Sequence, residues 1–300
     1  MVQKVLITGC SGFLGVNLAQ RLLDKGHEVI GFGWIEKLRP YPPIIHKNFT
    51  FISGDVRNEQ DYYQLPCVDA IFHLAANTGI TKGLIHPYLD FETNTIATVK
   101  LLEWARLYGK PLFVYPSSNK VYPLEKKSRT PYGASKHTAE IWVMEYAHTF
   151  NLPAVVLRQS CIYGPHQYGF MEQGWIAWFM RANCKGLPVQ VFGDGNQKRD
   201  ILYVDDLIDF YELLLEKKEL WGNIYDVGGG KDRIVSVNDV ISFIERFNKP
   251  FVKVEYVGER KADQRTYVTD LKPLWAIWEP HTGIIEGLEK TLEWVKNNEI

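Results

Sequence analysis

The sequence predicts an α/β fold, a doubly wound parallel sheet with helices on both faces followed by a smaller C-terminal α/β domain. Residues 1–160 alternate short β-rich runs with helical patterns, and this alternation is typical of a parallel sheet. The β-rich runs are continuously apolar, as expected of strands that are buried on both faces. A glycine-rich turn also joins the first strand to the first helix.

The elements of the first half follow one another at regular intervals. Strands are expected over 4–8, 28–32, 49–53, 69–74, 112–115 and 154–157. Two stretches between these strands have apolar residues at helical spacing and are followed by glycine, which stops a helix. The first contains Phe13, Leu14, Leu18, Leu22 and Leu23 before Gly26, and the second contains Ile96, Val99, Leu102, Trp104 and Leu107 before Gly109.

The second half changes character after Gly164-Pro165. Short elements are separated there by turns rich in glycine and aspartate, at 193–195 and 228–230, without regular alternation. We therefore expect one domain over 1–165 and a second over 166–300, with a segment of about 199–230 returning to the first domain.

Composition excludes several classes of protein. The 300 residues are 46% hydrophobic and 23% charged, which fits neither a disordered chain nor a disulfide-stapled miniprotein. The net charge of −1 provides no field for nucleic acid or an anionic membrane, so any bound anion must be held by local groups.

The cysteines and the lack of targeting patterns predict a location. Four cysteines, Cys10, Cys67, Cys161 and Cys184, show no C-x-x-C pairing, which favours reduced thiols over a metal site. No apolar run approaches the ~18 residues of a membrane span, and the N-terminus lacks a signal-peptide pattern. We expect a soluble cytoplasmic protein without a metal.

A phosphate-binding loop is predicted after the first strand. Thr8 to Gly15 has the spacing G-x-x-G-x-x-G and opens the first helix. Glycines let the backbone approach a pyrophosphate, and the helix N-terminus offers free N–H groups and the positive end of its dipole. The loop residues expected to contact a dinucleotide are Gly9, Ser11, Gly12, Phe13 and Leu14.

The second strand ends without the acid that normally holds the adenosine ribose. Gly33-Trp34 stands where a carboxylate is expected, and the nearest acid is Glu36, followed by Lys37 and Arg39. We expect NAD as the cofactor. NADP stays an alternative, because a missing carboxylate removes repulsion against a ribose phosphate.

Tyr132 and Lys136 stand four residues apart at the start of a helical pattern, and hence on one face. A free tyrosine has a pKa of about 10, and a neighbouring ammonium group lowers it. Upstream, Ser117 and Ser118 place hydroxyls at the carboxyl edge of the sheet, where open α/β sheets bind ligands.

These motifs, in this order, resemble the extended short-chain dehydrogenase/reductases of the nucleotide-sugar epimerase and dehydratase family. The resemblance covers essentially the whole chain. It includes Gly54-Asp55-Val56, His73-Leu74-Ala75-Ala76, Asn94, Leu157-Arg158, Ile162 to Pro165, Arg199-Asp200, Val204 to Asp206, Gly287-Leu288 and Glu293-Trp294. It implies a Rossmann domain that binds the dinucleotide and a second domain that binds a nucleotide-diphosphate sugar.

The resemblance also implies roles for individual residues. Ser118 and Tyr132 would flank the reacting sugar carbon, with Tyr132 as acid or base, and Lys136 would bind nicotinamide ribose and acidify Tyr132. Further cofactor contacts are expected from Asp55, Val56, Leu74, Ala75, Ala76 and Asn94, with His73 on the cofactor side. Substrate contacts are expected from Asn119, Gln173, Trp175, Arg199, Arg260 and Asp263, the two arginines holding the diphosphate.

Asn119-Lys120 narrows the reaction, because family members that dehydrate sugars carry an Asp-Glu pair there, and without it elimination lacks its acid and base. Epimerisation by transient hydride transfer to tightly bound NAD remains as the expected reaction.

Motifs around 118–122, 173–179 and 262–265 are similar to the CDP-paratose (CDP-tyvelose) 2-epimerase branch, although the 13 residues between Ser118 and Tyr132 form a shorter loop than that branch has. The alternatives are a UDP-sugar 4-epimerase, an NADPH-dependent 4-keto-sugar reductase and a non-catalytic dinucleotide-binding protein. The family also implies a homodimer.

Overall fold

The chain forms two compact units. A computed structural model describes residues 2–34, 44–123, 130–171, 173–259 and 264–298. Unit 1 is built from the described parts of Met1–Pro123, Lys127–Arg158 and Ile208–Tyr225, and unit 2 from those of Gln159–Leu207 and Asp226–Ile300. Among the described residues, the chain therefore leaves unit 1 after Arg158 and returns to it once, over Ile208–Tyr225.

Unit 1 is organised around a seven-stranded sheet with the order β10-β6-β5-β4-β1-β2-β3. The pairs β3–β2, β2–β1, β1–β4 and β4–β5 are all parallel. The strands are β1 (Lys4–Thr8), β2 (Glu28–Gly33), β3 (Phe49–Ser53), β4 (Ala70–His73), β5 (Leu112–Ser118), β6 (Ala154–Gln159) and β10 (Asn223–Val227). The strand order reverses at β1 and β4, and ligands bind at the carboxyl ends of strands beside such a reversal.

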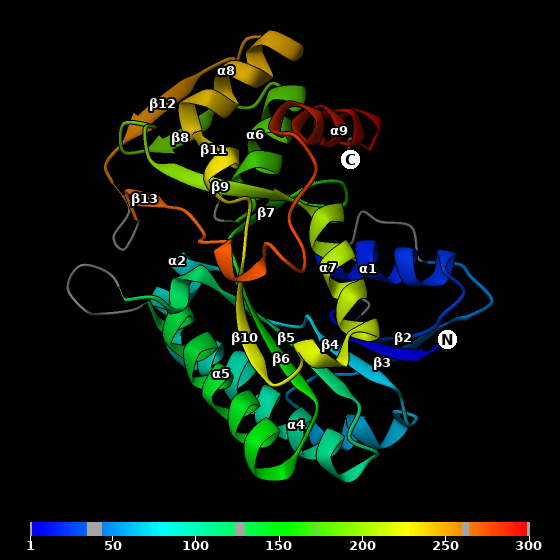
Figure 1. The fold of residues 1–300 in the computed structure, drawn as a ribbon. Coiled ribbons are helices and arrows are strands. Elements are labelled where there is room, and N and C mark those ends of the chain that lie inside the picture. Colours follow the sequence, from blue (N-terminus) through cyan, green and yellow to red (C-terminus); the bar gives the residue numbers. More distant parts are fainter. Residues whose placement is uncertain (1, 35–43, 124–129, 172, 260–263, 299–300) are drawn as a thin grey trace. The chain divides into compact units, whose positions relative to one another are not determined.

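Helices cover both faces of this sheet. In Figure 1, α4 and α5 lie on one side, while α1 and the part of α7 that belongs to unit 1 lie on the other. The helices are α1 (Phe13–Asp24), α2 (Ile80–Ile85), α3 (Pro87–Phe91), α4 (Ala97–Leu107), α5 (Pro131–Phe150) and α7 (Val204–Glu216), with a π turn η2 (Glu92–Ile96) and 3-10 turns η1 (Glu59–Gln64), η3 (Asn119–Val121) and η4 (Lys218–Leu220). Apolar side chains of the sheet, α4 and α5 form one buried core.

Unit 2 has its own core between short strands and three helices. Strand β9 pairs with β7 and β13 in parallel and with β11 antiparallel, and β8 pairs with β12 in parallel. The elements are β7 (Cys161–Tyr163), α6 (Trp175–Lys185), β8 (Val189–Phe192), β9 (Lys198–Tyr203), η5 (Lys231–Arg233), β11 (Ile234–Ser236), α8 (Val237–Phe247), β12 (Val254–Val257), β13 (Thr266–Tyr267), η6 (Lys272–Leu274) and α9 (Ile284–Asn297).

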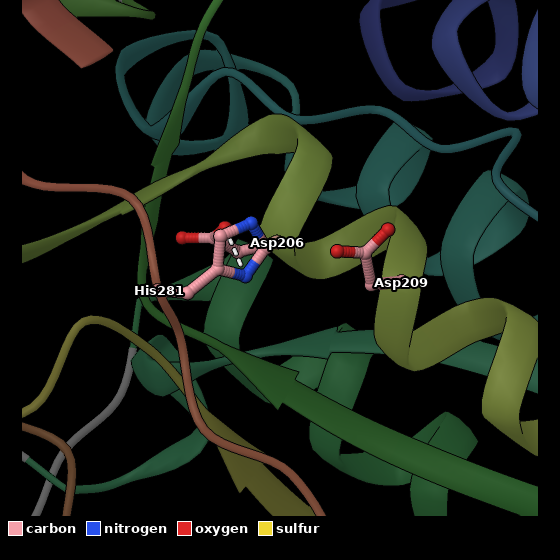
Figure 2. Close-up of side chains that lie close together, drawn as sticks. All are labelled: Asp206, Asp209 and His281. Atoms are coloured by element: carbon pink, nitrogen blue, oxygen red, sulfur yellow. Dashed lines mark ion pairs between the residues drawn. The ribbon is translucent and has the colours of Figure 1, made fainter. Parts of the chain in front are cut away.

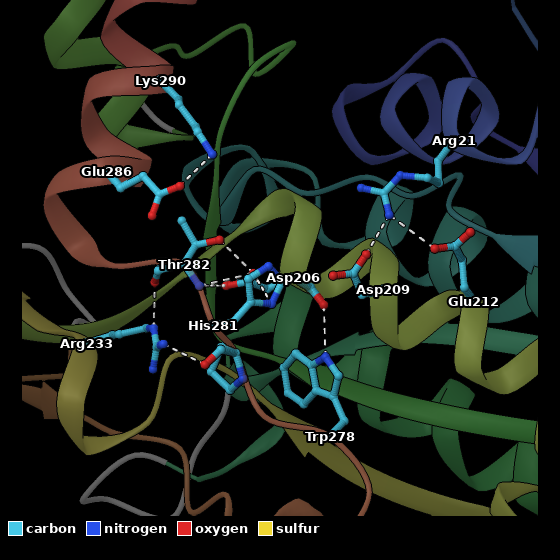
Figure 3. Close-up of polar contacts among 11 residues, drawn as sticks. Arg21, Asp206, Asp209, Glu212, Arg233, Trp278, His281, Thr282, Glu286 and Lys290 are labelled. Atoms are coloured by element: carbon cyan, nitrogen blue, oxygen red, sulfur yellow. Dashed lines mark hydrogen bonds and ion pairs between the residues drawn. The ribbon is translucent and has the colours of Figure 1, made fainter. Parts of the chain in front are cut away.

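Helix α7 begins in unit 2 and continues into unit 1, with polar anchors in each. In unit 2, the buried Asp206 carboxylate accepts hydrogen bonds from Thr282 and lies 3.1 Å from His281 Nδ1. Figure 2 shows this pair, with Asp209 one turn further along the helix. In unit 1, Asp209 and Glu212 bind the Arg21 guanidinium of α1 (Figure 3). These acids are therefore already engaged as anchors of each unit.

The predicted fold class is confirmed, and the strands lie close to their predicted positions. Strand β5 is longer than predicted, because it continues through Pro116 to Ser118 instead of ending at Tyr115. This extension makes Ser118 the last residue of the strand. None of the helices among the described residues has the length and apolar character that crossing a membrane requires.

Candidate active site

The candidate catalytic residues of α5 stand at its start, where capping fixes the helix. Thr130 is the N-cap, and its hydroxyl accepts a hydrogen bond from Gly133 N at 3.1 Å. Pro131 occupies the first helical position, where its missing N–H costs nothing. Tyr132 and Lys136 then project from successive turns, and both are buried, with 9% and 4% of their surfaces exposed.

The Ser118 side chain acts on the Tyr132 hydroxyl and favours its ionised form. Ser118 lies where β5 ends, and its own hydroxyl accepts from Lys120 N at 3.2 Å as the N-cap of η3. Burial raises the pKa of Tyr132 to about 12, although Ser118 acts in the opposite direction. Ser118 therefore lies close enough to act on Tyr132, and their joint role at the reacting sugar carbon stays a prediction.

Lys136 is buried beside Tyr115 of β5, with its ammonium nitrogen 4.4 Å from the centre of the tyrosine ring. Burial lowers the pKa of Lys136 to about 7, and the charge of Glu140 opposes this change. The pKa of Tyr132 is raised on balance, and a lowering of it by Lys136 stays a prediction. Both groups are removed from water, and burial disfavours the charged form of each.

A network that the sequence analysis missed holds α5 against the segment after β4. Asn94 Nδ2 donates to Ser135 Oγ at 3.0 Å and to Asn77 O at 2.9 Å, while Asn94 Oδ1 accepts from Asn77 N at 2.8 Å. Asn77 Nδ2 in turn donates to Asp90 Oδ1 at 2.6 Å. The side chain of Asn94 is thus used in protein contacts, and a cofactor contact from it stays a prediction.

Asp90 is buried beside the candidate site and is a residue that sequence reasoning missed. Its Oδ2 atom is buried without a hydrogen-bond partner among the described residues, and burial raises the pKa of this carboxyl group. Its charge acts on Tyr132, whose pKa it raises further. Asp90 and Asn94 are four residues apart, so their spacing in the sequence could have indicated that both lie on one face of a helix.

The predicted phosphate loop joins β1 to α1. Gly9 has a φ of +66°, and a Cβ there would lie 2.8 Å from the backbone N of Ala75. A Cβ at Gly15 would lie 2.4 Å from Gly9 O, so the first turn of the helix packs directly on the loop. Gly12 is the N-cap of α1 and provides no side-chain cap, and Ser11 Oγ is buried with no hydrogen bond to any described residue.

The predicted adenosine end of the site, at Gly33, is bordered by Trp34 and Arg57. Gly33 has a φ of +155°, a backbone conformation that side chains rarely adopt. Next to it, the Arg57 guanidinium lies 5.4 Å from the centre of the half-exposed Trp34 ring. Arg57 also binds Asp55 and Glu92. Burial opposes ionisation of Asp55, but the hydrogen bonds from Arg57 outweigh it and lower the pKa of that carboxyl.

The segment after β4 brings Leu74, Ala75 and Ala76 next to the loop, since Ala75 N donates to Thr8 Oγ1 at 3.1 Å. His73 lies behind it, between Thr8 Oγ1 at 2.8 Å and Thr98 Oγ1 at 3.1 Å. Complete burial lowers the pKa of His73 to about 3, so the ring is neutral. Through these contacts His73 connects β4 to β1 and α4, and a cofactor contact from it stays a prediction.

The candidate substrate residues of unit 2 lie near β7 and β9. Trp175 opens α6, and its indole N–H donates to Cys161 Sγ at 3.2 Å. Arg199 lies on the neighbouring strand, two residues before Ile201, which pairs with Cys161. Gln173 is exposed and forms a β-bridge with Phe170. Arg260 and Asp263 lie outside the described residues.

Comparison with known proteins identifies the family. A model of the family described as "NAD dependent epimerase/dehydratase family" matches residues 5–228. The chain belongs to the NAD-dependent epimerase/dehydratase family. The predicted family, enzyme class and NAD dependence are thereby confirmed.

Similar proteins share nearly the whole chain. CDP-paratose 2-epimerase from Salmonella typhi is 31% identical over 337 aligned residues, covering 98% of this chain and 99% of that protein. UDP-glucuronate 4-epimerase from Thermodesulfobacterium geofontis is 30% identical, with 98% and 96% covered. Among solved structures, UDP-glucose 4-epimerase from Thermus thermophilus in complex with NAD has a TM-score of 0.86 at 27% identity, with 98% and 99% covered.

The residues described above fit the dinucleotide of an NAD-dependent epimerase/dehydratase. Gly9, Gly12 and Gly15 leave a cradle that any Cβ would narrow, and the hydroxyl of Ser11 is buried in it without a partner among the residues that the structure describes. A pyrophosphate would supply both an anion for the N-terminus of α1 and an acceptor for that hydroxyl.

Proposed function

We propose that this protein is a nucleotide-diphosphosugar epimerase that uses tightly bound NAD. The observation that carries this proposal is the buried Tyr132, on which Ser118 acts and which is followed one helical turn later by the buried Lys136. These three residues end β5 and begin α5, beside the strand reversal where α/β sheets bind ligands.

The proposed chemistry divides between the cofactor and the chain. Bound NAD supplies a hydride acceptor and donor. Tyr132 Oη takes the proton of the reacting sugar hydroxyl as the ketone forms and returns it when the inverted hydroxyl forms, so that no net oxidation results. Ser118 Oγ orients that hydroxyl, and the charged form of Lys136 stabilises the phenolate of Tyr132.

The substrate class has two candidates, a CDP-sugar inverted at C2 and a UDP-sugar inverted at C4. Support for each comes from similar proteins, because one relative is a CDP-paratose 2-epimerase and another a UDP-glucuronate 4-epimerase, at 31% and 30% identity. We propose that unit 2 binds the nucleotide sugar, with Arg199, Trp175 and Gln173 among its contacts. Planar guanidinium groups suit paired phosphate oxygens.

A product screen tests this function. Purified protein is incubated with UDP-glucose, UDP-glucuronic acid, CDP-paratose and dTDP- and GDP-hexoses, and the products are separated by chromatography and identified by mass spectrometry and NMR. We expect one sugar to reach equilibrium with its epimer while the NAD content of the protein stays constant. Steady consumption of NADPH with a 4-keto sugar would contradict the epimerase.

A 4-keto-sugar reductase is the second candidate function, and Gly33 is the observation that favours it. Without a carboxylate at this position, a ribose phosphate meets less repulsion. Competitive binding of NAD and NADP, followed by calorimetry, separates the two candidates. An epimerase with bound NAD should prefer NAD, whereas a clear preference for NADP would favour the reductase.

A non-catalytic dinucleotide-binding protein is the third candidate. Such a protein would need the phosphate loop for binding, but Lys136 would have no catalytic role in it. Lys136→Met should abolish any epimerisation found in the screen, because the substitution removes the charge next to Tyr132. Unchanged turnover in this variant would contradict the proposed role of Lys136. No turnover by the unmodified protein across the whole panel would favour the non-catalytic alternative.

We propose a homodimer formed through α4 and α5. Large apolar side chains on these helices or directly after α4 are exposed, including Leu107, Tyr108, Ile141 and Trp142. Arg106 of α4 lies 5.2 Å over the Phe150 ring of α5, so the C-terminal ends of the two helices are in contact. Light scattering coupled to gel filtration should give twice the mass of one chain, and Trp142→Glu should give the monomer.

We also propose a cytoplasmic location. The four cysteines, all of which the structure describes, form no disulfide, and thiols stay reduced in reducing compartments. Fractionation of cells that express the tagged protein, with marker enzymes for each fraction, tests this location.

A further inference from the structure

Helix α5 carries a third buried polar residue on the same face as the candidate catalytic pair. Tyr132, Lys136 and Glu140 follow one another at intervals of four residues, which places them on one side of the helix. Only 1% of the surface of Glu140 is exposed. A carboxylate at this depth is costly unless it is paired.

Arg158 of β6 supplies the partner through a two-pronged contact. Its Nε donates to both carboxylate oxygens of Glu140 at 3.1 Å, and one terminal nitrogen donates to Oε2 at 2.8 Å. His137 Nδ1 lies 3.4 Å from the same oxygen. Paired contacts of this kind between a guanidinium and a carboxylate are strong and fix orientation.

The second terminal nitrogen of Arg158 reaches the turn that follows Ser118. It donates to the Tyr122 hydroxyl at 3.2 Å, and the guanidinium lies 5.2 Å over the Tyr122 ring. Tyr122 ends η3, the turn that Ser118 caps. A single arginine therefore links the helix that carries Tyr132 and Lys136 to the turn that begins at Ser118.

The charges around Lys136 come from several elements. Tyr115 of β5 and the neutral His73 of β4 lie on the sheet side, and the charge of Lys136 contributes to keeping His73 neutral. Tyr132 stands on the same helix, and Asp90 of α3 acts on Tyr132. Glu140 is the carboxylate that favours the charged form of Lys136.

We propose that Glu140 and Arg158 are positioning residues for the candidate catalytic site. Glu140 keeps Lys136 in its ammonium form, while Arg158 limits the field of that carboxylate and holds the turn after Ser118 against α5. This inference rests on the proposed function of Lys136 and Tyr132, but its test needs no substrate.

The two partners have opposite effects on Lys136, and this opposition distinguishes positioning from mere packing. Glu140→Gln removes the favourable carboxylate and leaves the Arg158 cation, so the ammonium form becomes less stable. Arg158→Met leaves an unbalanced carboxylate, so the ammonium form becomes more stable. Removal of both, in Glu140→Gln/Arg158→Met, deletes the carboxylate that acts on Lys136 together with the cation paired to it, and should have an intermediate effect.

The experiment measures the titration of Lys136 directly. The full-length protein is labelled with [13Cε]lysine, the Lys136 signal is assigned by its loss in Lys136→Met, and its midpoint is followed by NMR between pH 5 and 10. We expect a midpoint lowered by about one pH unit in Glu140→Gln and raised by about one in Arg158→Met, with the double variant between Glu140→Gln and the unmodified protein. Arg158→Lys, which keeps the charge, should restore most of the original midpoint.

Glu286→Gln is the matched control, because it removes a carboxylate from the exposed Glu286–Lys290 pair of α9. It should leave the Lys136 midpoint unchanged. Shifts of the same sign in both single variants, or none in folded variants, would overturn the proposal. If the single variants do not fold, the double variant decides, and a midpoint at or above that of the unmodified protein overturns it.

The outcome is separable from that of the proposed function. The expected order of midpoints without turnover of any nucleotide sugar would support the role of Glu140 and Arg158 and contradict the epimerase. Turnover without the expected order would support the epimerase and contradict this inference.

Discussion

The candidate chemical groups of unit 1 and the candidate binding groups of unit 2 differ in how the protein holds them. Tyr132 and Lys136 are buried and fixed by a capped helix, with Ser118 at the end of a strand. In unit 2, Gln173 is exposed and Arg199 and Trp175 are half-buried. Groups that change protonation need a fixed environment, whereas groups that recognise a large polar ligand must stay accessible to it. Substitutions in the two units should therefore impair different properties of the protein.

The largest effect is expected at Tyr132. Tyr132→Phe removes the hydroxyl that exchanges the proton and should lower kcat by about 10³-fold, within the range of general acid–base catalysis. Steady-state kinetics on the substrate found by the panel measures this loss. The midpoint of urea unfolding and the NAD content should stay close to those of the unmodified protein, and a variant with more than a tenth of the original kcat would exclude Tyr132 as the acid or base.

A second large effect is expected at the phosphate loop. Gly9→Ala places a Cβ 2.8 Å from Ala75 N at a φ of +66°, so we expect about tenfold or greater loss of NAD affinity and a stability loss of about 2 kcal/mol. Gly26→Ala is the control, because Gly26 also has positive φ but its Cβ would meet nothing within 4 Å. Calorimetry and urea unfolding should show a loss of stability but normal NAD binding in the control; equal loss of NAD affinity in both variants would contradict the loop's role.

A smaller effect, confined to the nucleotide, is expected in unit 2. Arg199→Ala should raise the Kd of UDP or CDP by about tenfold, since it removes a charge-assisted contact to phosphate. Binding of NAD should not change. Lys198→Ala on the same strand serves as the control, and a similar loss of nucleotide affinity in that variant would indicate a general charge effect.

A further effect concerns stability alone. The pKa of His73 is lowered to about 3 by burial, against 6.5 for the free side chain, so below pH 6.5 the unfolded chain binds a proton that the folded protein does not. Its contribution to stability is therefore present above pH 6.5 and is lost as the pH falls towards 3. Relative to His73→Gln, the unmodified protein should lose about 2 kcal/mol between pH 7.5 and 5, measured by urea unfolding. An equal pH dependence in both proteins would contradict a neutral His73.

Some residues of the candidate site could be predicted from the sequence and others could not. The phosphate loop and the Tyr132–Lys136 pair are local patterns, so spacing alone placed them on the right elements. Glu140 continues the same spacing and could have been found by extending the pattern by one turn. Arg158 and Tyr122 could not be assigned to it, because their contacts join segments separated by 18 and 36 positions.

The sequence by itself determined the order of strands and helices, the glycine loop and the Tyr132–Lys136 pair, because each depends on residues close together in the chain. Tertiary structure decided the charge states and the partners. Burial, which no local pattern specifies, raises the pKa of Tyr132, lowers that of Lys136 and keeps His73 neutral. It also determines that Asn94 binds its neighbours and that Glu140 meets Arg158, because hydrogen bonds in a dry interior must be satisfied by whichever residues the fold brings together.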